Sequence, residues 1–401
     1  MSGCLQGIKV IECAQWIQGP VAGSMLGDLG AEVIKVENRD TGDPGRGLAR
    51  VAGLTTGVAG RNYIAAYANR NKRSITLDLR KQQGQELLFH FVKECDVFIH
   101  NFRPGVDKNL KVDYDTLKQH NPKLIYAQAT GFGEKGPVGL QPAFEYSAMA
   151  RAGWLYLAGE PDTGPLLFKS GAGDHIGAAF LVQGILAALL ARERLGIGQK
   201  VDVSLLGSLI TIASLPVTCS LVLGQEYPRR SRYTMGNPLF NNYKCADDKW
   251  LVLNMQEDKY WPSFCKTMGI EHLKDDTKFS DMDVRSQNAR ELISTLDTLF
   301  SRRPRDEWLK ILTCNGLIAG PIQTTEEMTT DPQVLENEYI MEYDHPVWGS
   351  TRCVGFPWKF SSTPAILSRE EPEVGQHTEE ILLEFGYNWN DIVELKEKEV
   401  I

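Results

Sequence analysis

The residue best placed to do chemistry is Asp174, which follows Gly-Ala-Gly at 171–173 and precedes the most apolar stretch of the chain. Glycines permit a tight turn, so a large ligand could approach the backbone closely at this point. A carboxylate at a helix N-terminus is also stabilised by the helix dipole and by free N–H groups. The pattern leaves two interpretations open, because Asp174 could be a reactive carboxylate or an ordinary helix N-cap.

Two further residues could take part in acid–base chemistry. His175 is adjacent to Asp174, but neighbouring side chains on a helix do not face each other, which favours a capping or surface contact. Glu145 lies in the segment QPAFEY at 141–146. It is either a second active-site carboxylate or a solvated glutamate at the start of a helix.

Basic and aromatic residues near predicted strand ends could hold an anionic ligand. The run RNKR at 70–73, followed by Arg80, suits phosphates, although a solvated turn explains it equally well. The segment NFRPG at 101–105 directly follows a predicted strand. Ligands of open α/β sheets bind beyond the carboxyl ends of strands. Phe102 in this loop offers a face on which a purine could stack.

The charge balance and the cysteine pattern argue against several classes of protein. The chain has 43 Lys and Arg against 51 Asp and Glu, a net charge of −8, so we expect no binding to nucleic acid. Eight cysteines and seven histidines are scattered without any Cys-x-x-Cys pair. This spacing predicts no metal site and is typical of a reducing compartment.

The chain opens without the features of an export signal, since no basic residue precedes a short apolar run. The longest apolar stretch, IGAAFLVQGILAALLA at 176–191, has 16 residues and runs into Arg192. That is shorter than the roughly 20 residues of a membrane span. We therefore expect a buried core helix, no membrane association and a cytoplasmic protein.

The elements that must position these residues alternate between strands and helices. Helices are expected at 20–30, 83–94 and 174–194, the last ending at Gly196. This rhythm predicts parallel βα units and a doubly wound α/β sheet. The predicted strands are at 8–13, 31–37, 73–79, 96–100, 123–129 and 200–206.

The first loop after a strand argues against a nicotinamide enzyme. It reads IQGPVAG at 17–23 and lacks the first glycine of the dinucleotide fingerprint G-x-G-x-x-G. Pro20 also removes a backbone donor that a pyrophosphate would use.

A change in residue composition marks a predicted domain boundary. Residues 1–220 form the predicted large domain, and the polar, turn-rich segment 221–245 is the predicted linker. A small α+β domain is expected over 246–325, with a strand at 250–254 and helices at 259–268, near 287–301 and at 305–314. The C-terminal segment 326–401 is expected to return to the large domain and ends in a predicted helix at 378–385.

Taken together, the sequence resembles the class III coenzyme A transferases, the family of formyl-CoA and carnitine CoA-transferases and of 2-methylacyl-CoA racemases. Each matching segment is loose alone, but their order along nearly the whole chain is specific. The segments are LQGIKVIE, GPVAGSMLGDLGAEVIKVE, NRNKRSITLDLR, DVFIHNFRPG, NPKLIYAQATGFGEKGP, GDHIGAA, ALLARERLGIGQKVDVSL and GQHTEEILLEFGY.

The resemblance implies roles for particular residues. The family's nucleophilic aspartate falls on Asp174 and the transferase branch's glutamate on Glu145. No cofactor is implied beyond coenzyme A and its acyl esters, which are substrates. The CoA contacts implied by the family fall on Ile17, Gln18, Arg39, Leu77, Arg80, Asn101, Phe102 and Arg103.

The resemblance also implies a reaction, transfer of CoA from an acyl-CoA donor to a free carboxylic acid. The racemase branch uses a histidine–aspartate pair, but the segment around Glu145 has no histidine within 20 residues on either side, which favours the transferase. A non-catalytic CoA-binding relative is the third alternative. Asn109 stands where the family often has a basic residue, which puts one phosphate contact in doubt.

Fold, assembly and substrate follow from the same resemblance. It implies a Rossmann-like large domain with a parallel sheet, a smaller α+β domain and an interlocked, ring-like homodimer. The glycine-run loop of formyl-CoA transferases is absent. We expect a dicarboxylic, branched or aromatic acid to be preferred over formate and oxalate. Four aromatic residues lie in segments that the family places near the acyl group: Trp16, Phe144, Tyr146 and Trp154.

Overall fold

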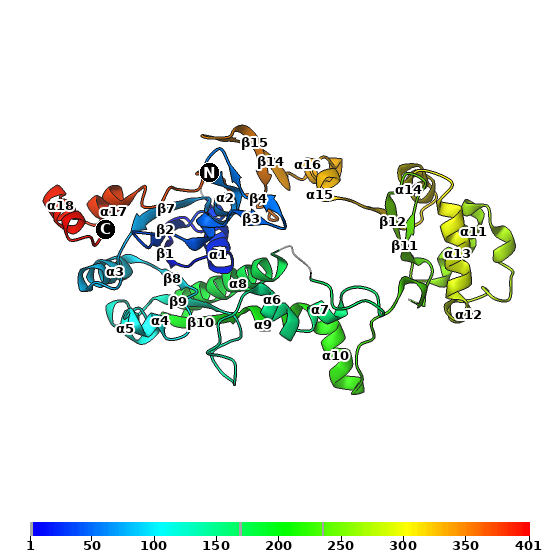
Figure 1. Cartoon of the computed structure of the whole chain (residues 1–401), viewed down its shortest axis with the longest axis horizontal. Coiled ribbons are helices and arrows are strands. Elements are labelled where there is room, and N and C mark those ends of the chain that lie inside the picture. The colour runs from blue at the N-terminus through cyan, green and yellow to red at the C-terminus, as the bar shows by residue number, and fades with distance from the viewer. Residues whose placement is uncertain (1–2, 168–170, 235) are drawn as a thin grey trace. The chain divides into compact units, whose positions relative to one another are not determined.

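The computed structural model describes residues 3–167, 171–234 and 236–401, and the chain divides into two compact units (Figure 1). The larger unit comprises the chain up to Leu155, Leu167–Gln225 and Glu338–Ile401. The smaller unit comprises Tyr156–Leu166 and Glu226–Asn337. Each unit has its own hydrophobic core.

A six-stranded parallel sheet forms the centre of the larger unit, in the order β10-β9-β8-β1-β2-β7. Apart from the edge strand β10, its strands are buried nearly throughout, as expected where both faces of a parallel sheet are covered. All six predicted strands are present, shifted at their ends by a few residues. They are β1 (Lys9–Cys13), β2 (Glu32–Glu37), β7 (Lys72–Thr76), β8 (Val97–His100), β9 (Ile125–Thr130) and β10 (Gln199–Ser204).

The strand order places a switch point between β1 and β8. From β1 the chain continues to β2 and β7 on one side, and from β8 it continues to β9 and β10 on the other. Loops leaving the carboxyl ends of β1 and β8 therefore diverge and leave a crevice between them, which is where ligands of such sheets bind.

Helices cover both faces of the sheet. On one face α1 (Gln18–Asp28) and α8 (Ala172–Leu195) pack through buried residues such as Leu26 and Leu181. On the other face lie α3 (Gln82–Glu94), α5 (Tyr114–His120), α17 (Thr378–Glu384) and α18 (Trp389–Glu397). The two C-terminal helices, red in Figure 1, thus lie beside the blue N-terminal strands. Helix α17 was predicted from the sequence, whereas α18, which follows after only four residues, was not.

Helix α8 is the long apolar helix that the sequence predicted. It has 24 residues and lies between Gly171 and Gly196, both at positive φ. Among the described residues, α8 is the one single helix that is long and apolar enough to cross a membrane. Helices α9 and α10 meet the same criterion only if the pair, bent by 76°, is taken as one span. The helix is therefore longer than the 16-residue apolar run predicted. The buried face of α8 instead packs against α1, β9 and β10.

The smaller unit is an α+β unit built on the antiparallel sheet β11 (Phe240–Lys244), β12 (Trp250–Asn254) and β13 (Ala319–Ile322). Helices α11 (Trp261–Met268), α13 (Ala289–Phe300) and α14 (Arg305–Cys314) bury their apolar faces against it. Other helices here are α12 (Met282–Gln287), α15 (Thr325–Met328) and α16 (Pro332–Glu336).

The unit boundaries differ from the predicted segments. Helices α9 (Leu205–Ile212) and α10 (Ser214–Leu223) carry the larger unit past residue 220, and the chain leaves it after Gln225. Strand β11 occupies part of the segment 221–245 predicted to be a linker. Its sequence FNNYK looks polar because Asn241 is one of its two buried side chains. At the far end the chain returns to the larger unit at Glu338, not at 326.

The remaining elements of the larger unit are short. Helix α7 (Trp154–Leu157) spans the division between the units. The others are β3 (Arg50–Val51), β4 (Leu54–Thr55), β5 (Gly57–Val58), β6 (Arg61–Asn62), α2 (Tyr63–Asn69), α4 (Val106–Asn109), α6 (Glu145–Arg151), β14 (Ile340–His345) and β15 (Gly349–Val354).

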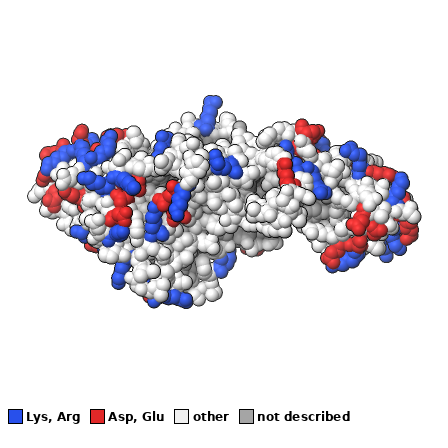
Figure 2. Space-filling view, turned by 90° about the horizontal axis from the view of Figure 1, so that it is seen from below, with Lys and Arg blue, Asp and Glu red and all other residues white. Residues whose placement is uncertain are grey.

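The surface is mixed in charge. On the face shown in Figure 2, Lys and Arg side chains lie among Asp and Glu side chains, and a broad area carries no charge. Apolar side chains are strongly exposed on α10, where Leu215, Leu221 and Val222 are 72%, 79% and 75% exposed. Contiguous exposed apolar residues mark surfaces that bind another molecule.

Candidate active site

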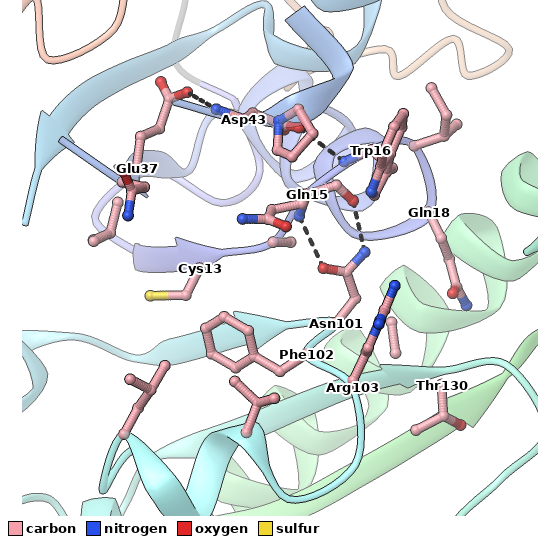
Figure 3. Close-up of a pocket in the computed structure, with 18 of the residues that line it drawn as sticks. Cys13, Gln15, Trp16, Gln18, Glu37, Asp43, Asn101, Phe102, Arg103 and Thr130 are labelled. Atoms are coloured by element: carbon pink, nitrogen blue, oxygen red, sulfur yellow. Dashed lines mark hydrogen bonds between the residues drawn. The ribbon is translucent and has the colours of Figure 1, made fainter. Parts of the chain in front are cut away.

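A cavity of about 620 Å³ lies at the carboxyl edge of the sheet in the larger unit. It is lined by the loops that follow β1, β2, β7, β8 and β9 (Figure 3). Its volume is within the range of about 300–1,000 Å³ usual for ligand sites. The crevice expected from the strand order is thus present, and Asp174 is among its lining residues.

Most of the residues that the resemblance assigned to CoA line this cavity. They are Ile17, Gln18, Leu77, Arg80, Asn101, Phe102 and Arg103. Arg39 is not among the lining residues, whereas its neighbour Asn38 is. The Arg39 guanidinium lies 3.6 Å from Asp40 and 3.5 Å from Glu399.

The two arginines of the cavity differ in their partners. Arg80 Nε donates to Asp78 Oδ1 at 2.8 Å, so a phosphate must share this guanidinium with a carboxylate. Arg103 is exposed and extends between Asn101 and Thr130 (Figure 3). No carboxylate of the described residues pairs with it. Arg103 is therefore the freer of the two cations.

The basic run at 70–73 does not line the cavity, so it was wrong to consider it a phosphate site. Arg70 pairs with Asp28 at 2.7 Å. The fully buried Lys72 pairs with Glu12 at 2.7 Å. Arg73 binds Glu380 and Glu384 on α17. These basic side chains are therefore already paired with carboxylates that are distant in the sequence.

Asp174 and Glu145 form a pair of carboxyl groups at the start of α8. Asp174 is the third residue of α8, whose N-cap is Gly171, so the N-cap interpretation was wrong. Glu145 begins α6, and its Oε1 accepts the Gly173 N–H at 2.6 Å. A Cβ at position 173 would lie 2.9 Å from Glu145 Cγ. Glycine at 173 is therefore what allows the two helix starts to approach this closely.

The electrostatics of the pair are unusual. Burial, and secondarily the charge of Glu145, raise the pKa of Asp174 to about 7. Burial also raises the pKa of Glu145, although N–H groups of Gly173 and Asp174 oppose this shift. The Asp174 carboxyl therefore changes its charge near neutral pH rather than in the acid range usual for aspartate. Carboxyl groups with such a shift in a cavity are candidates for catalysis.

His175 and Tyr67 flank the carboxyl pair. His175 Nδ1 is bonded to the Gly171 carbonyl at 2.7 Å, which is a local backbone contact and not a cap of the N–H groups at the start of α8. The Tyr67 ring lies 5.6 Å from the His175 ring. Burial, followed by the charges of Asp174 and Glu145, raises the pKa of Tyr67 to about 12. No motif around Tyr67 signalled this position, because the helix that carries it lies a hundred residues away in the chain.

Two aromatic side chains form one wall of the cavity. Trp16 and Phe144 meet edge to face, with ring centroids 5.7 Å apart, and they are 37% and 59% exposed. Tyr146 and Trp154, also expected near the acyl group, do not line the cavity. Trp154 Nε1 donates to the Leu209 carbonyl at 3.0 Å, so this residue serves core packing.

Gln18 supplies a polar group without a partner. Its side chain is 5% exposed and lines the cavity, and its Nε2 has no hydrogen-bond acceptor among the described residues. It lies against Gly177, one turn beyond Asp174 on α8. A buried donor left without a partner costs free energy unless a ligand satisfies it.

Comparison with known proteins identifies the family. A family model for CoA-transferase family III matches residues 5–378. The chain belongs to this family. Its members transfer CoA between acyl-CoA esters and carboxylates, and the chain is accordingly an acyl-CoA:carboxylate CoA-transferase of class III.

Full-length relatives agree with this assignment. The chain is 33% identical to a succinate–glutarate CoA-transferase of Agrobacterium fabrum, over 95% of each chain. It is 32% identical to a cinnamoyl-CoA:phenyllactate CoA-transferase of Clostridium sporogenes, over 98% of this chain and 97% of the relative. A crystal structure of a CaiB/BaiF family protein from Brucella suis matches with a TM-score of 0.85 and 30% identity, over 96% of this chain and 100% of the other. The α/β fold of the family is thereby confirmed.

Proposed function

We propose that Asp174 is the nucleophile of the transferase and that the loops after β1, β7 and β8 hold the CoA ester. The observation that carries this proposal is the placement of Asp174. It lies in the cavity at the switch point of the sheet, next to a second carboxyl group, with a pKa of about 7. With its pKa raised in this way, the Asp174 carboxylate is more basic, and so a better nucleophile, than an ordinary aspartate.

The proposed reaction has four steps. A carboxylate oxygen of Asp174 attacks the donor thioester carbonyl, the C–S bond breaks, and a mixed anhydride and the CoA thiolate form. The thiolate attacks the aspartyl carbonyl, which gives an aspartyl-CoA thioester and releases the donor acid. The acceptor carboxylate attacks that thioester, and CoA leaves again as the thiolate. The thiolate then attacks the acceptor acyl carbon, which frees acyl-CoA and regenerates Asp174. Because every bond is exchanged, no water, metal or redox partner enters the balance.

Glu145 holds the start of α8 in place and contributes to the high pKa of Asp174. The N–H of Gly173 is already bonded to Glu145, so it is not free to stabilise an oxyanion. Gln18 Nε2 is a buried donor without a partner in the same cavity. We assign the thioester carbonyl oxygen to this amide.

The cavity does not favour the racemase alternative. Epimerisation beside a thioester needs a base on each face of the carbon. His175 is the histidine nearest to Asp174 in the chain, and its Nδ1 is already bonded to the Gly171 carbonyl.

Peptide mass spectrometry after treatment with an acyl-CoA and hydroxylamine tests the nucleophile. Hydroxylamine cleaves an aspartyl anhydride or thioester and leaves a hydroxamate on the attacking residue. We expect the hydroxamate on Asp174 and not on Asp43 or Asp78, which line the same cavity. Turnover without a hydroxamate on Asp174 would overturn the assignment.

For the acceptor, we propose a dicarboxylic, branched or aromatic acid rather than formate or oxalate. The aromatic wall of Trp16 and Phe144 supports this, because a large apolar surface gains little from a one- or two-carbon acid. A panel of acids with one acyl-CoA donor decides it through kcat/KM. Higher kcat/KM for formate or oxalate would contradict the proposal.

We further propose an interlocked homodimer located in the cytoplasm. The exposed apolar side chains of α10 support an interface, and eight free cysteines fit a reducing compartment. Light scattering measures the mass in solution, and a fluorescent fusion reports the location. A monomer at micromolar concentration would contradict the first part, and secretion the second.

A further inference from the structure

A chain of four buried charges ends at the cavity, where Asp43 is one of the lining residues. Lys72 Nζ pairs with Glu12 Oε2 at 2.7 Å, Glu12 Oε1 with Lys35 Nζ at 2.9 Å, and Lys35 with Asp43 Oδ2 at 3.0 Å. The side chains of all four are at most 2% exposed. Two cations and two anions sum to zero, as a buried group of charges requires. Replacing such a group by apolar residues is often neutral or stabilising, so its presence calls for a role beyond stability.

The chain of charges ends on the first loop of the cavity. Lys35 Nζ donates to the Ala14 carbonyl at 2.8 Å. Asp43 Oδ1 accepts the Trp16 N–H at 3.0 Å. Between them, Gln15 exchanges two hydrogen bonds with the Asn101 side chain, at 2.8 and 2.6 Å (Figure 3). Side chains therefore fix consecutive backbone groups of 14–16.

The backbone held in this way is strained. Trp16 has a φ of 66°, a conformation rare for a bulky residue. Such residues cost about 1–3 kcal/mol and persist only where the surroundings determine them. The strain places the indole against Phe144, which directly precedes Glu145.

We propose that Asp43 is a positioning residue that holds Trp16 in this strained conformation and thereby sets which carboxylic acid the cavity accepts. The proposal rests on the proposed function, in which Trp16 and Phe144 form the wall beside the acyl group. Asp43 is the member of the chain that touches both the buried cation and the Trp16 backbone. Its own N–H is held by Glu37 Oε2 at 3.0 Å (Figure 3), so it cannot follow Trp16 if the loop moves.

The decisive variant is Asp43→Asn. An amide is neutral and has one oxygen, so it cannot form the ion pair with Lys35 on one oxygen and accept the loop N–H groups on the other, and one of the two contacts is lost. Trp16→Leu removes the wall itself, and the double variant tests whether Asp43 acts through Trp16. Asp28→Asn is the matched control, because Asp28 is an equally buried, paired aspartate that lies outside the cavity.

Each variant is assayed with one acyl-CoA donor and two acceptors, phenyllactate and acetate. We expect Trp16→Leu to change the ratio of kcat/KM for the two acids by roughly ten-fold, the effect of a modest change in an apolar pocket. Asp43→Asn should change the ratio in the same direction by about three-fold or more, with the KM for the donor nearly unchanged. The double variant should match Trp16→Leu. Asp28→Asn should lower the melting temperature and leave the ratio unchanged.

Independent effects of Asp43 and Trp16, or an unchanged ratio in Asp43→Asn, would overturn the proposal. If Asp43→Asn does not fold, the double variant Lys35→Met/Asp43→Asn is used in its place, because it removes one cation and one anion together. Calorimetric affinities for the free acids are measured in parallel. If the wild type transfers no CoA, the proposed function is contradicted. If, in the same experiments, the wild type binds the two acids with different affinities and Asp43→Asn does not, this inference is supported. Equal affinity of the wild type and Asp43→Asn for both acids would contradict the inference itself.

Discussion

Two groups of buried charge in the larger unit show opposite electrostatics. In the chain of four buried charges each carboxylate faces an ammonium group. Although burial alone would raise the pKa of Asp43, Lys35 and the N–H groups of Trp16 and Gly45 hold it below its usual value. At the start of α8 no cation among the residues that the structure describes offsets the burial of Asp174, and its pKa rises to about 7. A buried carboxylate with a cation holds structure, whereas one without a cation is available for chemistry.

The largest expected effect comes from removing Asp174, the carboxylate whose charge no described cation offsets. Asp174→Ala should lower kcat for CoA transfer by at least roughly 10³-fold, because the covalent route is lost while the CoA site remains. Initial rates with a saturating acyl-CoA donor measure kcat, and calorimetry checks that CoA still binds. Asp78→Asn, a change in another cavity carboxylate, should retain transfer. Residual activity of Asp174→Ala near the wild-type value would show that the Asp174 carboxyl is not the reactive one.

Removing a carboxylate from the chain of four buried charges, where each carboxylate is paired with a lysine, should destabilise the fold instead. Glu12→Gln leaves Lys35 and Lys72 without their shared partner, so we expect a loss of about 3–5 kcal/mol in the free energy of unfolding. Urea unfolding followed by circular dichroism measures it. Glu94→Gln, which breaks the exposed pair with Lys9, is the control and should cost less than about 1 kcal/mol. Equal losses in the two variants would mean that burial does not distinguish these pairs.

The same contrast separates the two arginines of the cavity. Arg103 has no carboxylate partner in the part of the chain that the structure describes, whereas Arg80 is paired with Asp78. Losing a charge-assisted phosphate contact costs about 1.5–3 kcal/mol. Arg103→Ala should therefore raise the KM for the CoA ester by roughly ten- to a hundred-fold, and Arg80→Ala by less. Lys108→Ala, a nearby surface change, is the control. Unchanged calorimetric affinity for CoA in both arginine variants would make them ordinary surface residues.

The raised pKa of Asp174 also predicts a pH profile. The nucleophile is the ionised form, so kcat/KM should fall about ten-fold per pH unit below pH 7 and level off above it. Rates between pH 5.5 and 8.5 in buffers of constant ionic strength measure this limb. Glu145→Gln removes the second negative charge, so it should move the limb to lower pH. A flat profile would mean that another step limits the rate.

Local patterns along the sequence predicted much of this arrangement. Continuous apolar runs such as VFIH at 97–100 are sufficient for buried parallel strands, and the strand ends place loops such as 101–103 at the cavity. The helix start after Gly-Ala-Gly likewise singled out Asp174. Each of these signals is local, because it consists of residues only a few positions apart in the sequence.

What the sequence could not predict depends on partners far apart in the chain. The run at 70–73 looked like a phosphate site because Asp28 and Glu380 are not its sequence neighbours. The strained Trp16 has no local signal, since its φ is set by Asp43 across 27 residues. Strand β11 was hidden because it buries an asparagine whose amide binds the Arg232 carbonyl.

The smallest predicted effect is the most direct test of the comparison, because its sign differs between the two aspartates. The folded-state pKa of Asp174 is raised, so its contribution to stability is full below the unfolded pKa and is lost as pH rises through about 7. Asp174→Asn should therefore stabilise the fold, by about 1–2 kcal/mol at pH 8 after allowing for solvent screening, and by less at pH 5. The pKa of Asp43 is lowered, so its contribution is present above the unfolded pKa and is lost only as pH falls through the folded value. Asp43→Asn should thus destabilise at both pH values. Thermal unfolding of the two variants at pH 5 and pH 8 measures the difference, and a loss of stability for Asp174→Asn at pH 8 would mean that the buried Asp174 carboxylate has a counter-charge after all.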